Sequence, residues 1–248
     1  MTTLRSLIFN LLFFALTAAV AVLAVPLLAA PRGAMLATVR LWSRLVVVLL
    51  RVVCGVRVEL RGMHHIPAGG CVVAAKHQSA FDTIVWLGLL PDPAYVMKKE
   101  LLRIPLYGWH VRKAGMIPVD REGGGPALRA MLRQAVAAVA AGRQVVIFPE
   151  GTRTAPGERV PYQPGVVAIA AGTSAPVVPV ATDSGRIWGR RSFHKHPGII
   201  RISALPPLPP GLRRDALLTA LETAIETETA ALLDEPAGRS APVDKSVG

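Results

Sequence analysis

The chain has 248 residues, a formal net charge of +12 and a composition that is 52% hydrophobic but only 5% aromatic. This length suits one sizeable domain with an additional segment. The positive charge suits either nucleic acid or an anionic membrane, but the aromatic residues do not alternate with basic ones as in single-strand binders, so we expect membrane lipids and no nucleic acid as partners.

An uncharged apolar run, residues 7–30, lies near the N-terminus. As one helix it would reach roughly 36 Å, which is enough to cross the hydrocarbon core of a bilayer. A cleaved signal peptide is the alternative, because Arg5 precedes the run and small residues end it. The run exceeds the usual apolar region of about 7–15 residues in such peptides, so we expect a retained membrane helix.

A second apolar segment, residues 35–56, contains Arg40, Arg44 and Arg51. On a helix these three fall within about 40° of one another and form a single basic stripe. The segment is either an amphipathic helix packed on the domain or a helix lying in the membrane interface with its arginines on lipid phosphates. The neighbouring apolar run favours the second interpretation, so we expect residues 1–55 to form membrane-anchoring helices.

After residue 55 short apolar runs alternate with helical patterns, which is typical of an α/β layered domain with a mostly parallel central sheet. We predict strands at Val56–Leu60, Cys71–Ala75, Ala94–Met97, Met116–Val119, Val145–Phe148, Val177–Val180 and Ile199–Ile202. We predict helices at Phe81–Leu90, Pro126–Ala141, Val166–Ala171 and Leu212–Leu233. The domain would cover residues 56–235, and residues 236–248 are expected to be a disordered tail.

The two cysteines, Cys54 and Cys71, both lie in apolar runs. Their spacing supports neither a disulfide framework nor a C-x-x-C site, so a reducing cytosolic environment is the simpler assumption. Cys71, with Val and Ala as neighbours, is expected to be a core residue rather than a nucleophile.

A histidine and an aspartate interrupt the apolar pattern in the sequence KHQSAFD, residues 76–82. On a regular helix His77 and Asp82 would lie about 140° apart, so they can meet only if His77 lies in the turn before the helix. There Asp82 could accept the Nδ1–H and leave Nε2 free as a base. Ser79 is better explained as the N-cap of the following helix than as a nucleophile.

The sequence FPEGTRT, residues 148–154, follows another predicted strand. Its Glu150, Gly151 and Arg153 combine a carboxylate, a backbone that a ligand can approach closely and a guanidinium suited to bidentate phosphate recognition. These three residue types at the end of a strand predict a binding site for an anion.

Further cations follow two other predicted strands. Arg121 ends the sequence IPVDR, and Lys98 and Lys99 follow the sequence AYVM. Because ligands of open α/β sheets bind outside the carboxyl ends of the strands, these cations strengthen the prediction of an anion pocket.

Four segments resemble, in order and spacing, the four motifs of the 1-acylglycerol-3-phosphate acyltransferase family: residues 76–82, 117–121, 148–154 and 175–180. The resemblance covers residues 56–203, and an H-x4-D motif followed by FPEGTR is far more specific than either motif alone. The chain departs from the family pattern at Lys76, where asparagine is frequent, and at Pro118 in the second motif.

The resemblance implies a layered glycerolipid acyltransferase domain in which His77 is the general base and Asp82 orients it. The residues implied to bind the glycerophosphate end are Arg121, Glu150, Gly151 and Arg153. The segment around Pro179 is implied to shape the acyl or thioester side.

The family transfers fatty acyl groups from acyl-CoA or acyl-carrier protein to a hydroxyl of lysophosphatidic acid, giving phosphatidic acid. We therefore expect a thioester co-substrate, no cofactor and no metal. We also expect the protein at the inner membrane, with its catalytic domain on the cytoplasmic face.

Other classes of protein remain to be weighed. An acyltransferase for another lyso-lipid, such as a lyso-ornithine lipid or lysophosphatidylcholine, would share the base and differ in its head-group pocket. A non-catalytic membrane-binding protein would need only the basic surface. A zinc hydrolase would need a metal-ligand spacing that His64, His65 and His77 do not have.

Residues 121–129, REGGGPALR, lack G-x-G-x-x-G after a strand and are predicted to be a loop rather than a dinucleotide site.

Overall fold

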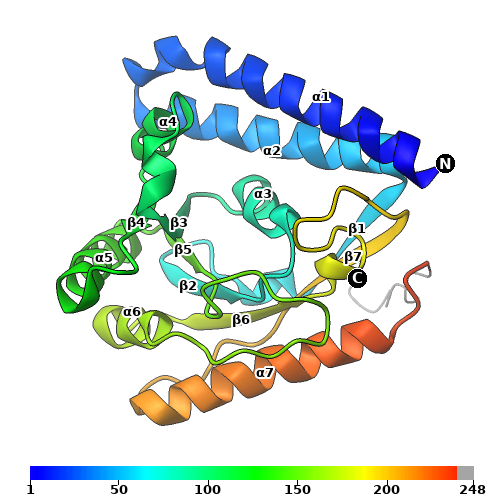
Figure 1. Ribbon diagram of the computed structural model, residues 1–248. Helices are drawn as coiled ribbons and strands as arrows, with labels where there is room; N and C mark the ends of the chain where they lie inside the picture. Colours follow the sequence, from blue (N-terminus) through cyan, green and yellow to red (C-terminus); the bar gives the residue numbers. More distant parts are fainter. Residues whose placement is uncertain (239–248) are drawn as a thin grey trace, which may run out of the picture.

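The structure, a computed structural model that describes residues 1–238, contains a seven-stranded sheet with helices on both faces (Figure 1). The strand order is β1-β7-β6-β2-β5-β3-β4. Strands β2 to β6 are parallel, whereas β7 is antiparallel to β6, and β1 is parallel to β7. The bounds are β1 Val56–Arg61, β2 Cys71–Ala75, β3 Pro93–Lys98, β4 Ile117–Val119, β5 Gln144–Ile147, β6 Val177–Thr182 and β7 Gly198–Ala204. All seven predicted strands form, which confirms the α/β class with a mostly parallel sheet.

The four predicted domain helices also form: α3 Ala80–Leu89, α5 Gly124–Ala140, α6 Gly165–Thr173 and α7 Arg214–Asp234. Helix α5 begins at Gly124, so the loop predicted over residues 121–129 is partly helical, with Pro126 in the first turn. The sequence pattern does not predict α4 Tyr107–Lys113, because 7 residues are too few to display a helical period. Short 3₁₀ segments lie at η1 Val25–Leu28, η2 Met63–His65, η3 Lys99–Arg103 and η4 Ser184–Arg186.

Two further helices, α1 Thr2–Leu23 and α2 Arg32–Cys54, lie side by side and form the N-terminal hairpin (Figure 1). The prediction of a single helix over residues 7–30 is wrong at its C-terminal end. Pro26 lacks the N–H that would continue the helix, and the chain passes through η1 before it turns back as α2. Within residues 1–238, α1 is the one helix that is long and apolar enough to cross a membrane.

The buried side of α1 is tied to the connection between β6 and β7. Lys195 donates from its backbone N–H to Ser6 Oγ at 2.9 Å and from Nζ to Asn10 Oδ1 at 2.6 Å. The fully buried Phe9 ring meets Trp188 edge-on, with the ring centroids 5.5 Å apart. These contacts make α1 part of the folded domain.

Helix α2 packs between α1 and α3. Ser43 Oγ donates to Ile84 O at 2.7 Å, and a Cβ at Gly88 would collide with Ser43 Oγ at 2.8 Å. Arg40 donates to the carbonyl of Pro91, so it is not free to contact a lipid phosphate. One side of α2 is therefore packed on the domain, and two of the three arginines in the basic stripe, Arg44 and Arg51, remain exposed.

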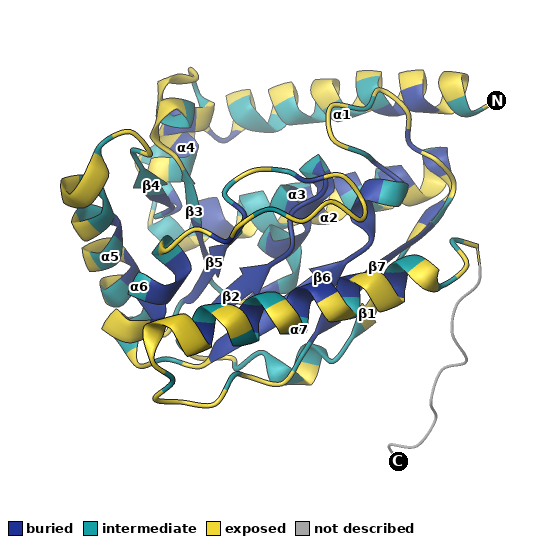
Figure 2. Ribbon diagram, turned by 60° about the horizontal axis from the view of Figure 1, so that its bottom comes forward, coloured by how far each residue is buried: buried dark blue, intermediate teal, exposed yellow. Residues whose placement is uncertain are grey.

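Side chains alternate between the two faces of the sheet, and each face has its own core. In β2, Cys71, Val73 and Ala75 pack with α1, α2 and α3, whereas Val72 and Ala74 pack with α5, α6 and α7. The two groups of helices lie on opposite sides of the sheet (Figure 1), and the central strands β2, β5 and β6 between them are buried (Figure 2). Burial raises the pKa of the Cys71 thiol to about 11, which agrees with a core position.

The C-terminal end of α7 is held to the sheet by ion pairs. Arg61 of β1 binds Glu235 at two points, from Nη1 to Oε1 at 2.5 Å and from Nη2 to Oε2 at 2.8 Å. Ala237 O accepts a hydrogen bond from Ile199 N of β7 at 2.9 Å. The first part of the predicted tail, residues 236–238, thus contacts the sheet, and its remaining residues lie outside the described part of the chain.

Candidate active site

The carboxyl ends of five parallel strands meet at one edge of the sheet, because β6, β2, β5, β3 and β4 are neighbours in that order. Strand β2 continues into Lys76 and His77, β5 into residues 148–154, and β4 into Arg121. The structure therefore brings three of the four motif segments to this edge. The fourth, residues 175–180, lies mostly within β6 itself.

Pro179 lies inside a strand rather than after its end, as the predicted strand Val177–Val180 implies. It is buried inside β6, opposite Ala74 of β2, and the strand runs on to Thr182. Its carbonyl accepts from Leu205 N at 2.9 Å, just past the end of β7. Proline has no N–H to donate, and at Pro179 the neighbouring strand β7 that would accept it has already ended. This position explains how a proline fits inside the sheet.

The spacing of His77 and Asp82 follows from the way α3 begins. Ser79 is the N-cap, and its hydroxyl accepts from Phe81 N at 3.1 Å. Asp82 completes a capping box, because its Oδ2 accepts from Ser79 N at 2.8 Å and from Gln78 N at 2.7 Å. The same Oδ2 lies 3.2 Å from His77 Nδ1. The structure thus shows both the predicted N-cap and the predicted contact.

The imidazole of His77 is fixed from two sides. It stacks on Phe148, with ring centroids 4.1 Å apart and planes inclined by 19°. Its Nδ1 faces Asp82, and its Nε2 has no hydrogen-bond partner among residues 1–238. Because Asp82 can accept the Nδ1 proton, the lone pair is left on Nε2.

The segment 148–154 also holds the main chain of His77. The His77 N–H donates to Glu150 Oε2 at 2.7 Å, and the His77 carbonyl accepts from Thr154 N at 2.9 Å. Thr154 Oγ1 donates to Glu150 Oε1 at 2.8 Å. The H-x4-D and FPEGTR segments therefore form one hydrogen-bonded unit around the histidine.

Lys76, next to His77, lies between two carboxylates although its side chain is only 1% exposed. Its Nζ lies 2.7 Å from Glu150 Oε1 and 2.7 Å from Glu226 Oε1 of α7. Tyr162 OH donates to the same Glu226 oxygen at 2.8 Å. Burial raises the pKa of Glu150, and the charge of Lys76 opposes that shift. Both oxygens of Glu150 are engaged inside the protein, which favours a positioning role over direct contact with a substrate.

Two arginines of the motifs have no direct partner for their guanidinium groups. Among residues 1–238, neither Arg121 nor Arg153 forms a hydrogen bond or ion pair. Burial lowers the pKa of both guanidinium groups, and a nearby carboxylate opposes each shift, Glu100 at Arg121 and Asp82 at Arg153. Arg153 therefore lies within electrostatic reach of the His77–Asp82 pair. An unpaired guanidinium in this position suits an anionic ligand.

The remaining predicted site residues lie around this edge. Lys98 and Lys99 follow β3 and are exposed, with Lys99 Nζ at 3.5 Å from Asp120 Oδ2. Gly151 has φ of 68°, in the left-handed region that favours glycine. A Cβ at Gly151 would also approach Gln163 Cγ to 3.1 Å, so this glycine shapes the turn that carries Glu150.

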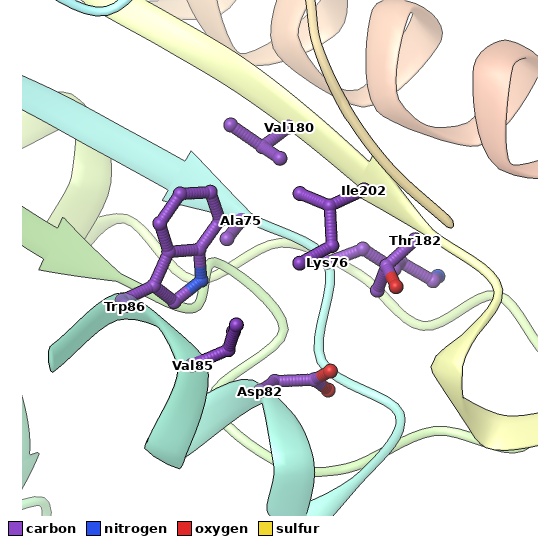
Figure 3. Close-up of a pocket in the computed structure, with 8 residues that line it drawn as sticks. All are labelled: Ala75, Lys76, Asp82, Val85, Trp86, Val180, Thr182 and Ile202. Carbon is purple, nitrogen blue, oxygen red and sulfur yellow. The ribbon is translucent and has the colours of Figure 1, made fainter. Parts of the chain in front are cut away.

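A small cavity lies beside the Asp82 carboxylate, between α3, the ends of β2 and β6, and Ile202 of β7 (Figure 3). Its volume is about 10 Å³, roughly the space that one water molecule needs. The residues lining it are Ala75, Lys76, Asp82, Val85, Trp86, Val180, Thr182 and Ile202. The cavity is therefore too small for a substrate group.

Sequence reasoning missed several residues of the site. Glu226 contacts Lys76, and Tyr162 donates to Glu226, and both come from segments that carry no motif. Arg190, in the connection after β6, is a second cation near Arg153 and lowers its pKa further. The replacement of the frequent asparagine by Lys76 is the one sequence signal that pointed toward this cluster. No group of three or more His, Cys, Asp or Glu side chains that could hold a metal ion occurs in the described part of the chain.

The arrangement suits proton transfer next to an anion. Asp82 fixes the orientation of His77 and leaves Nε2 able to accept a proton from a hydroxyl. The Ser79 hydroxyl is used in the helix cap and is not presented as a nucleophile. The site can therefore activate a hydroxyl of a bound anionic molecule without a covalent enzyme intermediate.

Comparison with characterised proteins points the same way. A family model described as Acyltransferase matches residues 57–183. The chain is 35% identical over 167 residues to a 1-acyl-sn-glycerol-3-phosphate acyltransferase from Pseudomonas aeruginosa, which covers 67% of this chain and 65% of that protein. It is 32% identical over 199 residues to a 1-acyl-sn-glycerol-3-phosphate acyltransferase alpha from Ovis aries, which covers 79% of this chain and 69% of that protein.

The fold is also similar to that of a solved protein. The crystal structure of the 1-acyl-sn-glycerophosphate (LPA) acyltransferase from Thermotoga maritima superimposes with a TM-score of 0.77 and 23% sequence identity. The superposition covers 95% of this chain and 99% of that one. At this identity the likeness establishes the fold, which extends over nearly the whole chain.

Proposed function

This chain belongs to the 1-acyl-sn-glycerol-3-phosphate acyltransferase family, and on that premise we propose that it transfers a fatty acyl group from a thioester to the sn-2 hydroxyl of lysophosphatidic acid. The product would be phosphatidic acid, which enters phospholipid biosynthesis. The observation that carries the proposal is the His77–Asp82 pair within reach of the unpaired Arg153. One site then holds a base for a hydroxyl and a cation for a phosphate.

In the proposed reaction His77 is the general base. An alcohol is a weak nucleophile near neutral pH, and a positioned base contributes about 10²–10⁴-fold to the rate. Nε2 takes the hydroxyl proton while the oxygen attacks the thioester carbonyl carbon. The ester C–O bond forms, the C–S bond breaks, and the proton passes to the departing thiolate. Asp82 stabilises the transient imidazolium through Nδ1.

We assign Arg121 and Arg153 to the phosphate of the acceptor, because neither guanidinium has a partner among residues 1–238. Lys98 and Lys99 add positive charge at the neighbouring strand end. Guanidinium groups bind phosphate through two parallel hydrogen bonds, so they fix its orientation as well as its position. The phosphate end would thereby hold the sn-2 hydroxyl near His77.

The N-terminal hairpin provides the membrane contact that a lipid acceptor requires. The large apolar side chains exposed on α1 and α2 are Leu4, Leu7, Ile8, Leu11, Leu12, Phe14, Val22, Leu23, Leu41, Leu45, Val48 and Val52. An apolar face of this extent is unusual on a protein that stays in water. The other side of α1 is docked on the domain through Lys195, so we propose that the hairpin lies in the membrane surface. The exposed Arg44 and Arg51 would then meet lipid phosphates on the cytoplasmic side.

The acyl donor would be acyl-CoA or acyl-carrier protein. Both present the same thioester on an acidic carrier, which the net charge of +12 suits. The thioester is already activated, which agrees with a site that has a base but no presented nucleophile.

The proposal is tested with purified protein in detergent, labelled acyl donors of both kinds, and a panel of lyso-lipids. We expect acylation of lysophosphatidic acid at sn-2, at least tenfold faster than of lysophosphatidylcholine or a lyso-ornithine lipid. Preference for one of the other acceptors would overturn the assigned head group. The absence of acylation with every acceptor and both donors would overturn the function.

A further inference from the structure

Three charged side chains beside His77 form a buried charge cluster, and their removal from water is unfavourable. Lys76, Glu150 and Glu226 have side chains that are 1%, 0% and 7% exposed. Removing such groups from water costs several kcal/mol per ion, and a well-packed apolar cluster of the same volume is often as stable. The cluster therefore calls for a role other than stability.

The cluster links α7 to the main chain of the base in three successive contacts. Glu226 Oε1 lies 2.7 Å from Lys76 Nζ, and Lys76 Nζ lies 2.7 Å from Glu150 Oε1. Glu150 Oε2 then accepts the N–H of His77 at 2.7 Å. A second branch enters through Tyr162 OH, which donates to Glu226 Oε1. A displacement of α7 or of Lys76 would thus change the hydrogen bond that holds the His77 main chain.

We propose that Lys76 is a positioning residue for the base: it keeps the Glu150 carboxylate ionised and aligned, and it fastens α7 to the site through Glu226. The inference rests on the proposed function and deepens it. An ionised Glu150 accepts from both the His77 N–H and the Thr154 hydroxyl. A protonated carboxyl loses acceptor capacity, and the His77 main chain would then be free to shift.

Such a shift would affect the rate because the imidazole depends on its main chain for its position. The His77 ring has to stay stacked on Phe148 while Nδ1 faces Asp82. Misplacement of a reacting group by about 1 Å can lower a rate about 10²-fold. Lys76 lines the small cavity beside Asp82 from the end of β2 (Figure 3), but its ammonium is already occupied by two carboxylates. It therefore acts through Glu150 rather than on a substrate.

The ionisable groups that face Glu150 come from several elements. Lys76 and His77 come from the end of β2, Tyr162 from the segment before α6, and Glu226 from α7. Glu222, one turn earlier on α7, adds a further negative charge near Tyr162. Lys76 supplies the positive charge in direct contact with this acidic group. Without it, the carboxyl groups would hold protons to higher pH.

The experiment is a double-mutant cycle of Lys76→Asn and Glu226→Gln, read as kcat and KM against pH. Lys76→Asn leaves two buried carboxylates without their cation. We expect kcat with lysophosphatidic acid to fall about 10- to 100-fold at pH 7, with KM unchanged within about twofold. The acid limb of kcat should move to higher pH. Adding Glu226→Gln to Lys76→Asn should recover at least about threefold in kcat, because one uncompensated carboxylate is removed.

Lys76→Arg is the conservative variant and keeps the cation, so the acid limb of kcat should stay near that of the wild type. It also keeps the proposal testable if Lys76→Asn fails to fold. A folded Lys76→Arg protein could instead lose kcat and have its acid limb at higher pH, as expected for Lys76→Asn. That result would contradict the proposed role of the Lys76 charge.

The matched control is the pair Arg61 and Glu235, which also holds α7 to the sheet but lies on β1, three strands away from β2. Arg61→Gln and Glu235→Gln should lower the melting temperature and leave the kcat of the folded enzyme within about twofold, with its acid limb in place. An equal loss of kcat in these controls would show that Lys76 only stabilises the fold, and would overturn the proposal.

Failure of the inference can be told from failure of the proposed function. If the wild type does not acylate lysophosphatidic acid, the proposed function falls, and the positioning role is measured by hydrogen exchange. Deuterium uptake over residues 76–82 should rise in Lys76→Asn and not in Arg61→Gln, because the His77 N–H is bound to Glu150. Uptake equal to that of the wild type in a folded Lys76→Asn protein would overturn the inference.

Discussion

The strand-end site and the N-terminal hairpin depart in opposite ways from the usual distribution of side chains. Around His77 the protein buries Lys76, Glu150 and Glu226. On α1 it exposes large apolar side chains, with Leu11 63% and Phe14 66% accessible. Buried charge and exposed hydrocarbon are both unfavourable in water. Together they match a substrate that has a charged head and an apolar tail and resides in a membrane.

We expect the residues of the two regions to contact different partners: the site contacts the substrate, and the exposed face of the hairpin contacts the membrane. Changes in the site should stop acyl transfer while the protein still binds membranes. Changes on the exposed face of the hairpin should release the protein from membranes while the chemistry survives in detergent. A variant that affected both properties equally would break this division.

The largest expected effect is that of His77→Ala. Removal of the base should lower kcat about 10²–10⁴-fold, because the hydroxyl loses its proton acceptor. Membrane pelleting and the melting temperature should stay near those of the wild type. His64→Ala, which removes a histidine from η2, is the control and should keep full activity. Turnover by His77→Ala within tenfold of the wild type would rule out the mechanism.

The next effect concerns the two unpaired arginines. Arg153→Ala and Arg121→Ala should each raise KM for lysophosphatidic acid, since a lost charge-assisted phosphate contact costs about 1.5–3 kcal/mol, or roughly 10- to 150-fold. KM for the acyl donor should change much less. Arg129→Ala, an exposed arginine on α5, is the control. If both site variants raise only the KM for the acyl donor, the two arginines bind the donor and not the phosphate of lysophosphatidic acid.

Changes on the hairpin should have a smaller effect and act on a different property. Leu11→Glu with Phe14→Glu should lower binding to anionic vesicles at least about tenfold, because burial of each apolar side chain is worth about 1.5–3 kcal/mol. The rate in detergent should persist. Ala137→Glu, on the exposed side of α5, adds charge without touching the hairpin and should pellet like the wild type. Unchanged pelleting of the double variant would show that this face does not meet the membrane.

The parts of the site that could be predicted from sequence are those built by local contacts. His77 and Asp82 meet because the helix start that Ser79 caps lies between them, so six residues contain all the information. The contact of Lys76 with Glu226 spans 150 positions, and nothing in α7 marks its glutamate as different from its neighbours. Pairing over such a distance depends on how α7 packs against the sheet, which hydrophobic patterns alone do not determine.

The strands show the same limit. Their positions follow from short apolar runs, but the position of Pro179 within its strand depends on where β7 ends beside it. The hairpin shows that composition can mislead, because the apolar run over residues 7–30 hides a turn at Pro26. Hydropathy shows how long an apolar run is, but it does not show where the chain turns back within it.

The smallest expected effect is on stability, at the attachment of the hairpin to the domain. Asp92 binds Arg32 of α2 and also Arg143. Burial disfavours ionisation of Asp92, but the two arginines outweigh it and lower its pKa below the ordinary 3.8. A lowered carboxyl pKa gives stability that is present above the unfolded pKa and is lost as the pH falls through the folded pKa.

Asp92→Asn should therefore lower the free energy of unfolding by about 1–2 kcal/mol at pH 7. The difference from the wild type should shrink below about pH 4, as the wild-type carboxyl is protonated. Urea unfolding at pH 7 and pH 3 measures both values. A difference that does not change with pH would show that the ion pair contributes no net stability. Acyl transfer by the folded variant in detergent should be unaffected.

The central claim is that His77 removes the proton from the acceptor hydroxyl, and an acceptor that ionises without help tests it most directly. The measurement compares wild type and His77→Ala on lysophosphatidic acid and on its analogue with a thiol in place of the sn-2 hydroxyl. A thiol, with a pKa of about 8.5 in cysteine, depends far less on a base than an alcohol does. We predict that the variant loses about 10²–10⁴-fold in kcat/KM with the hydroxyl acceptor and less than about tenfold with the thiol acceptor. Equal losses with the two acceptors would contradict the role of His77 as the base.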